Sequence, residues 1–158
     1  MTNTRRLTIV LLVVAATATA TAVTAQTDEQ AIRQAVLNYA DSAYFVKPEL
    51  VEKSVHPKLQ KIGYVPREDK GYRELWMNYY ELKELVSYWN AEARFDPETA
   101  RREIKILDRL DQTAVARLDA EWGIDFFQLA KIDGTWKIMN VIWQTYPPEP
   151  AAKGKGKN

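Results

Sequence analysis

The clearest apolar pattern in the chain has the spacing of an amphipathic helix. Apolar side chains recur three or four positions apart at Ile32, Ala35, Val36, Tyr39 and Ala43. This spacing places them on one helix face, which must be buried against something. Just before them, Thr27 and Gln30 have the spacing of a capping box, in which each side chain bonds to the other's backbone amide. The sequence therefore predicts a first helix that begins after Thr27.

Two shorter helices are predicted further along. Pro48 suits the first turn of a helix, so residues 49–54 are expected to be helical. Asn78 is a helix-capping residue, and Glu81 stands at the capping-box position three residues later. An apolar stripe follows at Leu82, Leu85, Val86 and Trp89. This third helix also has one buried face.

Between and after these helices, apolar and polar residues alternate as they do in strands. The predicted strands are residues 59–65, 72–77, 101–110, 113–122, 124–132 and 135–146. Asp133 and Gly134 join the last two. A two-residue type I′ turn needs positive φ at both positions, and Asp-Gly is favoured there because Gly adopts positive φ without a Cβ clash. Helices together with a long antiparallel meander predict an α+β fold, with the helices on one face of a curved sheet.

Strict alternation divides the last strand into two faces. One face carries Trp136, Ile138, Asn140, Ile142 and Gln144. The other carries Lys137, Met139, Val141 and Trp143. Because both faces hold large apolar groups, we expect helices on one side and a second subunit on the other. The sequence thus predicts a homodimer through Met139, Val141 and Trp143.

The two ends of the chain differ from its middle. Residues 1–25 contain Arg5 and Arg6, an apolar run too short to span a bilayer, and small residues up to Ala25. This order is typical of a secretory signal peptide, with an uncleaved membrane anchor as the alternative. Residues 26–146 are predicted to form one domain, and the Pro-, Lys- and Gly-rich residues 147–158 a disordered basic tail. We therefore expect export to the periplasm or beyond.

Charge and composition exclude several kinds of partner. The chain has 22 Lys and Arg against 21 Asp and Glu, and loss of Arg5 and Arg6 would leave 20 against 21. This balance gives no argument for nucleic acid or an anionic membrane as partner. With no cysteine and one histidine, neither a thiolate site nor a multi-histidine metal site can form. We expect no metal, no cofactor and no stable membrane insertion after signal cleavage.

Three segments carry a resemblance to a known family. They are AIRQAVLNYADS in the first helix, VHPKLQKIGY where the short helix meets a strand, and FFQLAKIDGTWKIMNVIW at the end. In this order, over residues 28–146, the chain resembles the nuclear transport factor 2-like superfamily, and within it the "putative lumazine-binding" and polyketide-cyclase-like branches. The resemblance implies a cone-shaped, cystatin-like fold, in which a curved antiparallel sheet wraps the N-terminal helices around an apolar pocket. It also implies a dimer through the outer face of the sheet.

One histidine and a few carboxylates are the candidates for acid–base chemistry. His56 is expected at the pocket mouth, where an imidazole can act as general acid or base. The alternative is that its ring caps the end of the short helix. A catalytic His56 would need a carboxylate partner, for which Asp41, Asp119 and Asp125 are the candidates. Asp119 shares its strand face with Arg117, so it lies either at a solvent-exposed or dimer rim or in a proton-transfer site.

The predicted ligand pocket lies between the first helix and the concave face of the sheet. Its expected lining is Tyr39, His56, Tyr64, Trp76, Asp125 and Asn140. Aromatic walls with a few polar groups suit a small apolar or aromatic molecule, although core packing explains the same residues. The leading hypothesis is an exported, non-catalytic binding protein. The alternatives are a cofactor-independent isomerase, cyclase or dehydratase, and a dimeric interaction module with a filled cone.

Overall fold

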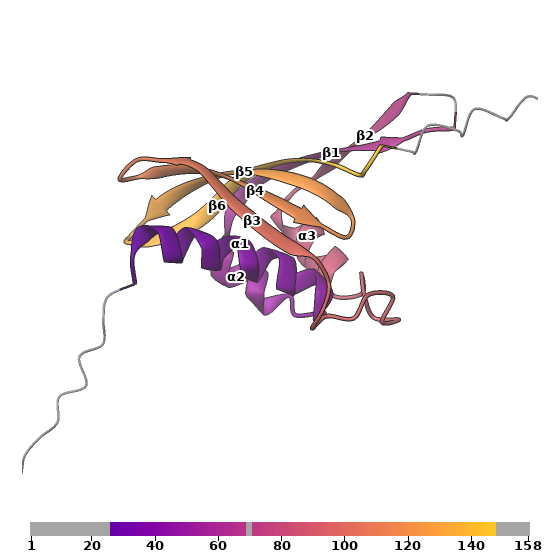
Figure 1. The fold of residues 1–158 in the computed structure, drawn as a ribbon, viewed down its shortest axis with the longest axis horizontal. Coiled ribbons are helices and arrows are strands. Elements are labelled where there is room, and N and C mark those ends of the chain that lie inside the picture. The colour runs from indigo at the N-terminus through magenta and orange to yellow at the C-terminus, as the bar shows by residue number, and fades with distance from the viewer. Residues whose placement is uncertain (1–25, 69–70, 148–158) are drawn as a thin grey trace, which may run out of the picture.

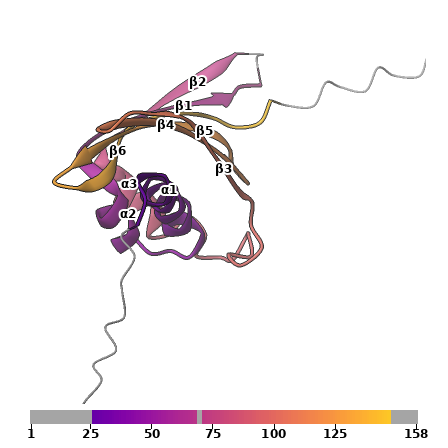
Figure 2. The ribbon, with the colours of Figure 1, turned by 60° about the vertical axis from the view of Figure 1, so that its left-hand side comes forward.

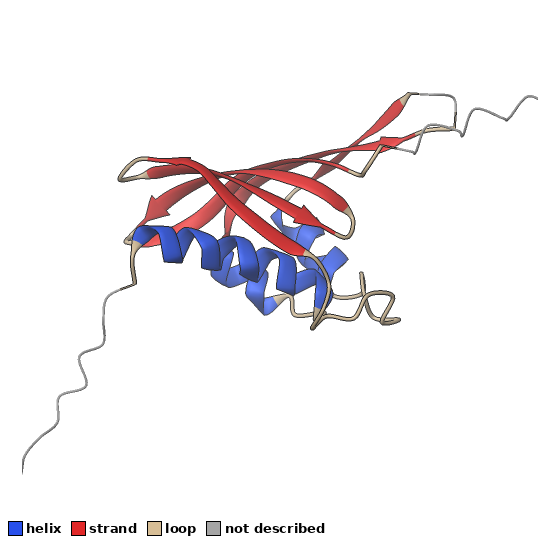
Figure 3. Ribbon diagram, in the orientation of Figure 1, coloured by secondary structure: helices blue, strands red, loops and turns tan. Residues whose placement is uncertain are grey.

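The computed structural model describes residues 26–68 and 71–147, and these form an α+β domain (Figure 1). Its helices are α1 (Asp28–Tyr44), α2 (Glu49–Ser54) and α3 (Tyr79–Val86). Its strands are β1 (Val55–Pro66), β2 (Tyr72–Met77), β3 (Arg102–Arg109), β4 (Thr113–Ala120), β5 (Gly123–Ile132) and β6 (Thr135–Gln144). Figure 3 shows the helices on one side of the sheet, as the sequence predicts. The proposed signal peptide and nearly all of the proposed tail lie outside the described residues.

The six strands of the described chain form one curved, unclosed sheet in the order β2-β1-β6-β5-β4-β3. Neighbouring strands are antiparallel, except that β1 and β6 are parallel. Figure 2 shows the sheet curving around α1, with the far parts of β1 and β2 extending beyond the rest as a two-stranded ribbon. The concave face is therefore the side on which the helices pack.

Local sequence features determine where several elements begin. Thr27 and Gln30 form the predicted capping box at the start of α1, and Asn78 and Glu81 form another at α3. The turn between β5 and β6 is also confirmed, with φ of 48° at Asp133 and 77° at Gly134. These motifs use contacts within a few residues, so they form wherever the rest of the chain permits.

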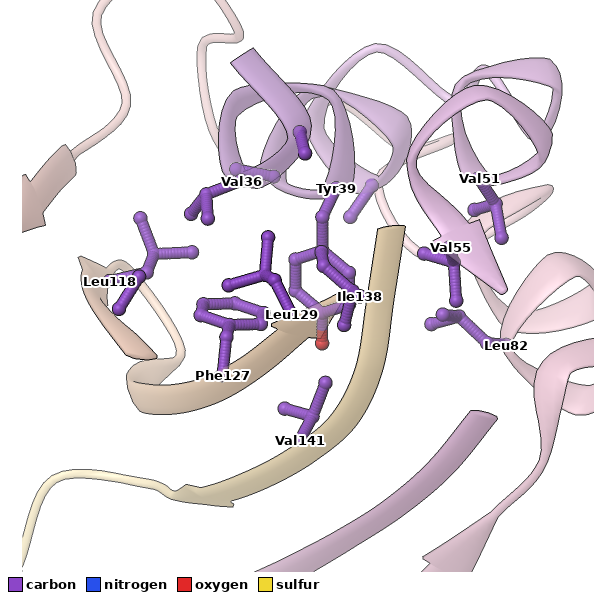
Figure 4. Packing of buried hydrophobic residues seen from close by; sticks show 14 of the residues in the cluster. Val36, Tyr39, Val51, Val55, Leu82, Leu118, Phe127, Leu129, Ile138 and Val141 are labelled. Atoms are coloured by element: carbon purple, nitrogen blue, oxygen red, sulfur yellow. The ribbon is translucent and has the colours of Figure 1, made fainter. Parts of the chain in front are cut away.

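The core fills the space between α1 and the concave face. The predicted stripe of α1 is buried, and Figure 4 shows Val36 and Tyr39 of this helix directed toward the side chains of the sheet. Phe127 of β5 packs edge-on against the Tyr39 ring, with the ring centroids 5.0 Å apart. Fully burying an aliphatic or aromatic side chain contributes about 1.5–3 kcal/mol, so this layer is the main source of stability.

The strict alternation predicted for β6 is wrong, because the strand contains a β-bulge. Gln128 of β5 pairs with Asn140, whereas Leu129 pairs with Ile138, which leaves Met139 as an extra residue. An extra residue reverses the alternation beyond it. Trp136 and Ile138 therefore point inward in the first half of β6, and Val141 points inward in the second half.

The bulge also changes the face expected for a dimer. Val141 is 0% exposed and belongs to the core, so it is not available to a second subunit. The outward residues of this part of the sheet are Ile142, which is 55% exposed, and Phe126, its register partner on β5.

In the part of the chain that the structure describes, no helix combines the length and apolar character needed to cross a membrane.

Candidate functional site

A small pocket lies on the concave side of the sheet, where α3 packs. Its volume is about 70 Å³. The lining residues come from α1, α3 and the turn that follows it, β1, β6 and the β4–β5 connection: Tyr39, Ala43, Lys61, Leu82, Leu85, Val86, Trp89, Trp122 and Trp143. Most of these side chains are apolar or aromatic, and Lys61 is the single formally charged residue among them. The pocket thus combines an apolar wall with one ammonium group.

The polar end of the pocket is a buried cluster of four side chains. The Lys61 ammonium donates to the Tyr39 hydroxyl at 2.5 Å and lies 3.3 Å from the Asp125 carboxylate. Tyr39 in turn donates to the same carboxylate oxygen at 3.2 Å. Trp122 donates its indole N–H to the other oxygen at 2.5 Å. Asp125 therefore receives three donors while it is 0% exposed, which is the arrangement that a buried carboxylate requires.

Burial determines the electrostatics of this cluster. Burial lowers the pKa of the Lys61 ammonium, and the attraction of Asp125 opposes that change. Burial also raises the pKa of Tyr39 well above its ordinary value, and the nearby Asp125 carboxylate adds to the effect. Tyr39 consequently stays a neutral hydroxyl that accepts from Lys61 and donates to Asp125.

Gly63 and Trp143 position the ammonium group. The two residues are register partners on β1 and β6, and a Cβ on Gly63 would lie 2.0 Å from the Trp143 ring. The missing side chain therefore gives the indole room to lie against the β1 backbone. The ring centroid of Trp143 is 4.8 Å from the Lys61 ammonium, and that of Tyr39 is 5.2 Å away. The Trp143 distance is typical of a cation–π contact, which helps to offset the loss of hydration, whereas Tyr39 meets the ammonium through its hydroxyl at the edge of the ring.

The wall formed by α3 is held at both ends. Asn78 accepts hydrogen bonds from the first turn of α3. Beyond the helix, the buried Asn90 side chain donates to the carbonyl oxygens of Tyr44 and Phe95 and accepts from the Phe95 amide. Between these anchors, Trp89 packs edge-on against Trp122 with centroids 5.2 Å apart. The apolar wall is thereby fixed relative to the cluster beneath it.

The structure brings together two of the six predicted ligand-binding residues. Tyr39 and Asp125 come from α1 and β5 and meet through the hydrogen bond between them. Tyr39 lines the pocket, whereas Asp125 lies behind it and contacts the lining residues Lys61 and Trp122. Asp125 alternates with the buried Phe127 and Leu129 along β5, so it shares their inward face.

The other four predicted residues do not line this pocket. His56 lies at the start of β1, where its Nδ1 accepts from the Lys58 amide. Tyr64 donates to Glu74 of the neighbouring strand, and the Trp76 indole donates to the same carboxylate. Trp76 is 65% exposed. Asn140 lies beyond the bulge, and its side chain donates to Gln128 at 2.8 Å.

The remaining candidate carboxylates belong to other contacts. Asp41 pairs with Arg102 at 2.6 Å. Asp119 pairs with Arg101 and Arg117 and accepts from Tyr146, and these donors hold its pKa below the usual range. Within residues 26–68 and 71–147, no three His, Cys, Asp or Glu side chains gather in a way that could hold a metal ion. The titratable cluster at the pocket therefore rests on Lys61, Tyr39 and Asp125.

Sequence reasoning missed Lys61, the residue at the centre of the cluster. Side chains alternate between the two faces of a strand, so Lys61 shares a face of β1 with Leu59 and Gly63, opposite to Ile62 and Tyr64. Both faces thus hold apolar groups, so the pattern does not show which one is buried. The ion pair joins residues 64 positions apart, and only folding brings them together.

Comparisons with known proteins agree with this architecture. A family model described as "Putative lumazine-binding" matches residues 27–144. No curated protein matches this chain in sequence. An NTF2-like protein of unknown function from Shewanella baltica OS155 is 21% identical, with a TM-score of 0.60, over 78% of this chain and 99% of that chain.

Two further solved structures are similar. An NTF2-like protein of unknown function from Methylobacillus flagellatus KT is 25% identical, with a TM-score of 0.55, over 79% of this chain and 98% of that chain. An NTF2-like protein with a cystatin-like fold from Novosphingobium aromaticivorans is 13% identical, with a TM-score of 0.55, over 79% of this chain and 86% of that chain. These likenesses show the fold.

Proposed function

Since this chain belongs to the "Putative lumazine-binding" family and has the NTF2-like, cystatin-like fold, we propose that it binds a small molecule in the pocket beneath α3. The observation that carries this proposal is the buried Lys61 ammonium at the inner end of an otherwise apolar pocket. A pocket with apolar walls and one well-positioned polar group is the usual form of a ligand site. A core formed for stability alone has no need of a buried ion pair, since apolar residues often serve as well.

The size of the pocket limits its ligand. Sites for drug-sized molecules occupy roughly 300–1,000 Å³. This pocket is about 70 Å³, so it holds a small molecule or one end of a longer one. Lumazine, which the family description mentions, is a two-ring heterocycle and would need the α3 wall to move. We therefore expect a ligand with one small ring or a short apolar chain.

The test is a screen of small fragments by ligand-observed NMR, with two matched variants on α3 and its C-terminal extension. Leu85→Trp fills the pocket that Leu85 lines, whereas Tyr88→Trp places the same side chain at a position that is 59% exposed. Binding should be lost in Leu85→Trp and kept in Tyr88→Trp. Absence of any binder, or equal binding to both variants, would reject the proposal.

A second candidate function, proton-transfer catalysis, is favoured by the same cluster. It places an amine, a phenol and a carboxylate within hydrogen-bonding distance of one another, as acid–base enzymes do. However, Asp125 is enclosed behind the lining residues, so it reaches a ligand only through Tyr39 or Lys61. Binding is therefore the better-supported function. Recovery of a bound fragment chemically unchanged after prolonged incubation distinguishes binding from catalysis.

We also propose a homodimer through the outer face of the sheet. Four register partners lie side by side across neighbouring strands there: Trp76, Ile62, Ile142 and Phe126. Three of these are exposed apolar side chains, and closed two-fold pairing is the commonest way to cover such a face. Ile142→Lys should lower the sedimentation coefficient to that of a monomer, whereas Ile132→Lys at the exposed end of β5 should not. A wild type that is monomeric at micromolar concentration contradicts the dimer.

Export is the final part of the proposal, and it rests on the sequence of residues 1–25. Their basic start, short apolar run and small residues before Gln26 support cleavage after Ala25. Amino-terminal sequencing of protein recovered from outside the cytoplasm should begin at Gln26. A mature chain that still contains Arg5 and Arg6 would contradict the signal peptide and favour an anchor.

A further inference from the structure

The hydrogen bonds of the buried cluster leave one donor for a ligand. An ammonium group has three N–H donors and no acceptor. For Lys61, two of them go to Tyr39 and Asp125, and among the described residues the third has no hydrogen-bond partner. Tyr39 already donates to Asp125, and the Trp122 indole N–H does the same. The cluster can thus donate one hydrogen bond into the pocket.

The charges of the cluster cancel within it. Lys61 is 5% exposed and Asp125 0%, and their charged groups lie 3.3 Å apart. A buried pair of this kind is tolerated because each charge neutralises the other. An anionic ligand would add an uncompensated charge next to the pair, and a cationic ligand would be repelled by the ammonium at the pocket wall.

The rest of the lining supplies little for a polar ligand to bind. Leu82, Leu85 and Val86 offer only hydrocarbon, and the Trp89, Trp122 and Trp143 side chains carry donors but no acceptors. A ligand hydroxyl or amide N–H buried here would lose its bond to water without gaining a side-chain acceptor, except at Tyr39. The lining therefore disfavours ligands that must donate.

We propose that the ligand of this pocket is a neutral molecule with an acceptor oxygen, such as a ketone, ester or ether, at one end and a small apolar body at the other. This inference rests on the proposed binding function. The acceptor oxygen takes the remaining N–H of Lys61, and the apolar body packs against the α3 residues and Trp143. The Lys61–Asp125 pair acts as a charge-neutral donor, which discriminates against acids and amines of the same size.

Four probes of similar shape test this selectivity in the full-length protein. They are cyclopentanone, the isosteric hydrocarbon methylenecyclopentane, cyclopentanecarboxylate and cyclopentylammonium, with affinities measured from NMR chemical-shift titrations. The ketone can accept a hydrogen bond from the ammonium and the hydrocarbon cannot, so the ketone should bind at least about tenfold more tightly. The carboxylate and the ammonium probe should both bind more weakly than the ketone.

Two variants show whether the ion pair causes the selectivity. Asp125→Asn removes the compensating negative charge, so the carboxylate should become the preferred probe. Asp119→Asn makes the same change in net charge on the outer face and should leave the order unchanged. Lys61→Met should abolish the difference between ketone and hydrocarbon. Circular dichroism and thermal unfolding show which variants fold. The order of the four probe affinities in the wild type decides the proposal even if a variant does not fold.

The outcomes separate this inference from the proposed function. Preference of the wild type for the carboxylate, the ammonium probe or the hydrocarbon overturns the inference and leaves small-molecule binding intact. If none of the four probes binds but the fragment screen yields a binder that Leu85→Trp blocks, the inference is again overturned and small-molecule binding stands. If that screen yields no binder, both the inference and the proposed function are rejected.

Discussion

The bulge in β6 can be tested by placing the same charged side chain at two adjacent positions. Strict alternation predicts that Asn140 points into the core and Val141 outward, whereas the structure has the opposite arrangement. Val141 is 0% exposed, and Asn140 bonds to Gln128 on the outer face. Val141→Lys and Asn140→Lys should therefore have very different effects on the free energy of unfolding.

The expected cost at Val141 follows from its surroundings. Loss of a fully buried valine side chain costs about 1.5 kcal/mol. An unpaired charge left in the core costs about 3–5 kcal/mol more. Lys61 is the register partner of Val141, so the new ammonium would also meet a like charge. In contrast, Asn140→Lys loses one exposed hydrogen bond and should cost less than about 1 kcal/mol.

Thermal unfolding of the two variants distinguishes these outcomes. A loss of about 5 kcal/mol lowers the midpoint by roughly 20 °C in a domain of this size, or prevents folding altogether. Asn140→Lys should stay within roughly 5 °C of the wild type. A mild Val141→Lys together with a severe Asn140→Lys would refute the bulge. Equal effects would refute the assignment of the two residues to opposite faces.

Three other changes give results that the structure specifies. Gly63→Ala should cost about 1–3 kcal/mol and alter tryptophan fluorescence, because the new Cβ would displace the Trp143 ring; unchanged spectra and stability contradict this packing. Burial raises the pKa of Tyr44 from 10.0 to about 12, so the free energy of unfolding should fall between pH 10 and 12 by at most about 3 kcal/mol. Urea unfolding of Tyr44→Phe should show a shallower decline over that interval. The pKa of Asp119 is lowered chiefly by its hydrogen bond from Tyr146, so the wild type loses stability as the pH falls below about 4 and this carboxylate is protonated. Asp119→Asn should lose less stability over the same interval, and identical acid profiles for the two proteins would contradict this role of Asp119.

The features that were predictable from sequence depend on residues close together in the chain. Each capping box joins residues three positions apart, and the Asp133–Gly134 turn needs only two residues with positive φ. The apolar stripe of α1 depends on helical periodicity, which a single sequence shows directly. These local features were sufficient to predict an α+β domain with its helices on one face of the sheet.

The features that were not predictable depend on contacts between distant segments. Nothing near Met139 shows that it is an extra residue, because the bulge is defined by pairing with β5. The parallel pairing of β1 with β6 likewise joins segments about 80 residues apart, such as Gly63 and Trp143. An error of one residue in the register of a strand exchanges its faces, which explains why Asn140 and Val141 were exchanged.

The elements, their order and the apolar face of α1 could be predicted from the sequence, because local hydrogen bonds and side-chain periodicity are encoded within short windows. The sequence also placed Asp125 on an inward strand face. The burial of Lys61 beside this carboxylate, in contrast, depends on long-range folding. A lysine on a strand with apolar residues on both faces does not show which face is buried. A buried ammonium is stable only when distant residues provide its partners. Tyr39 and Asp125, which come from α1 and β5, provide those partners here.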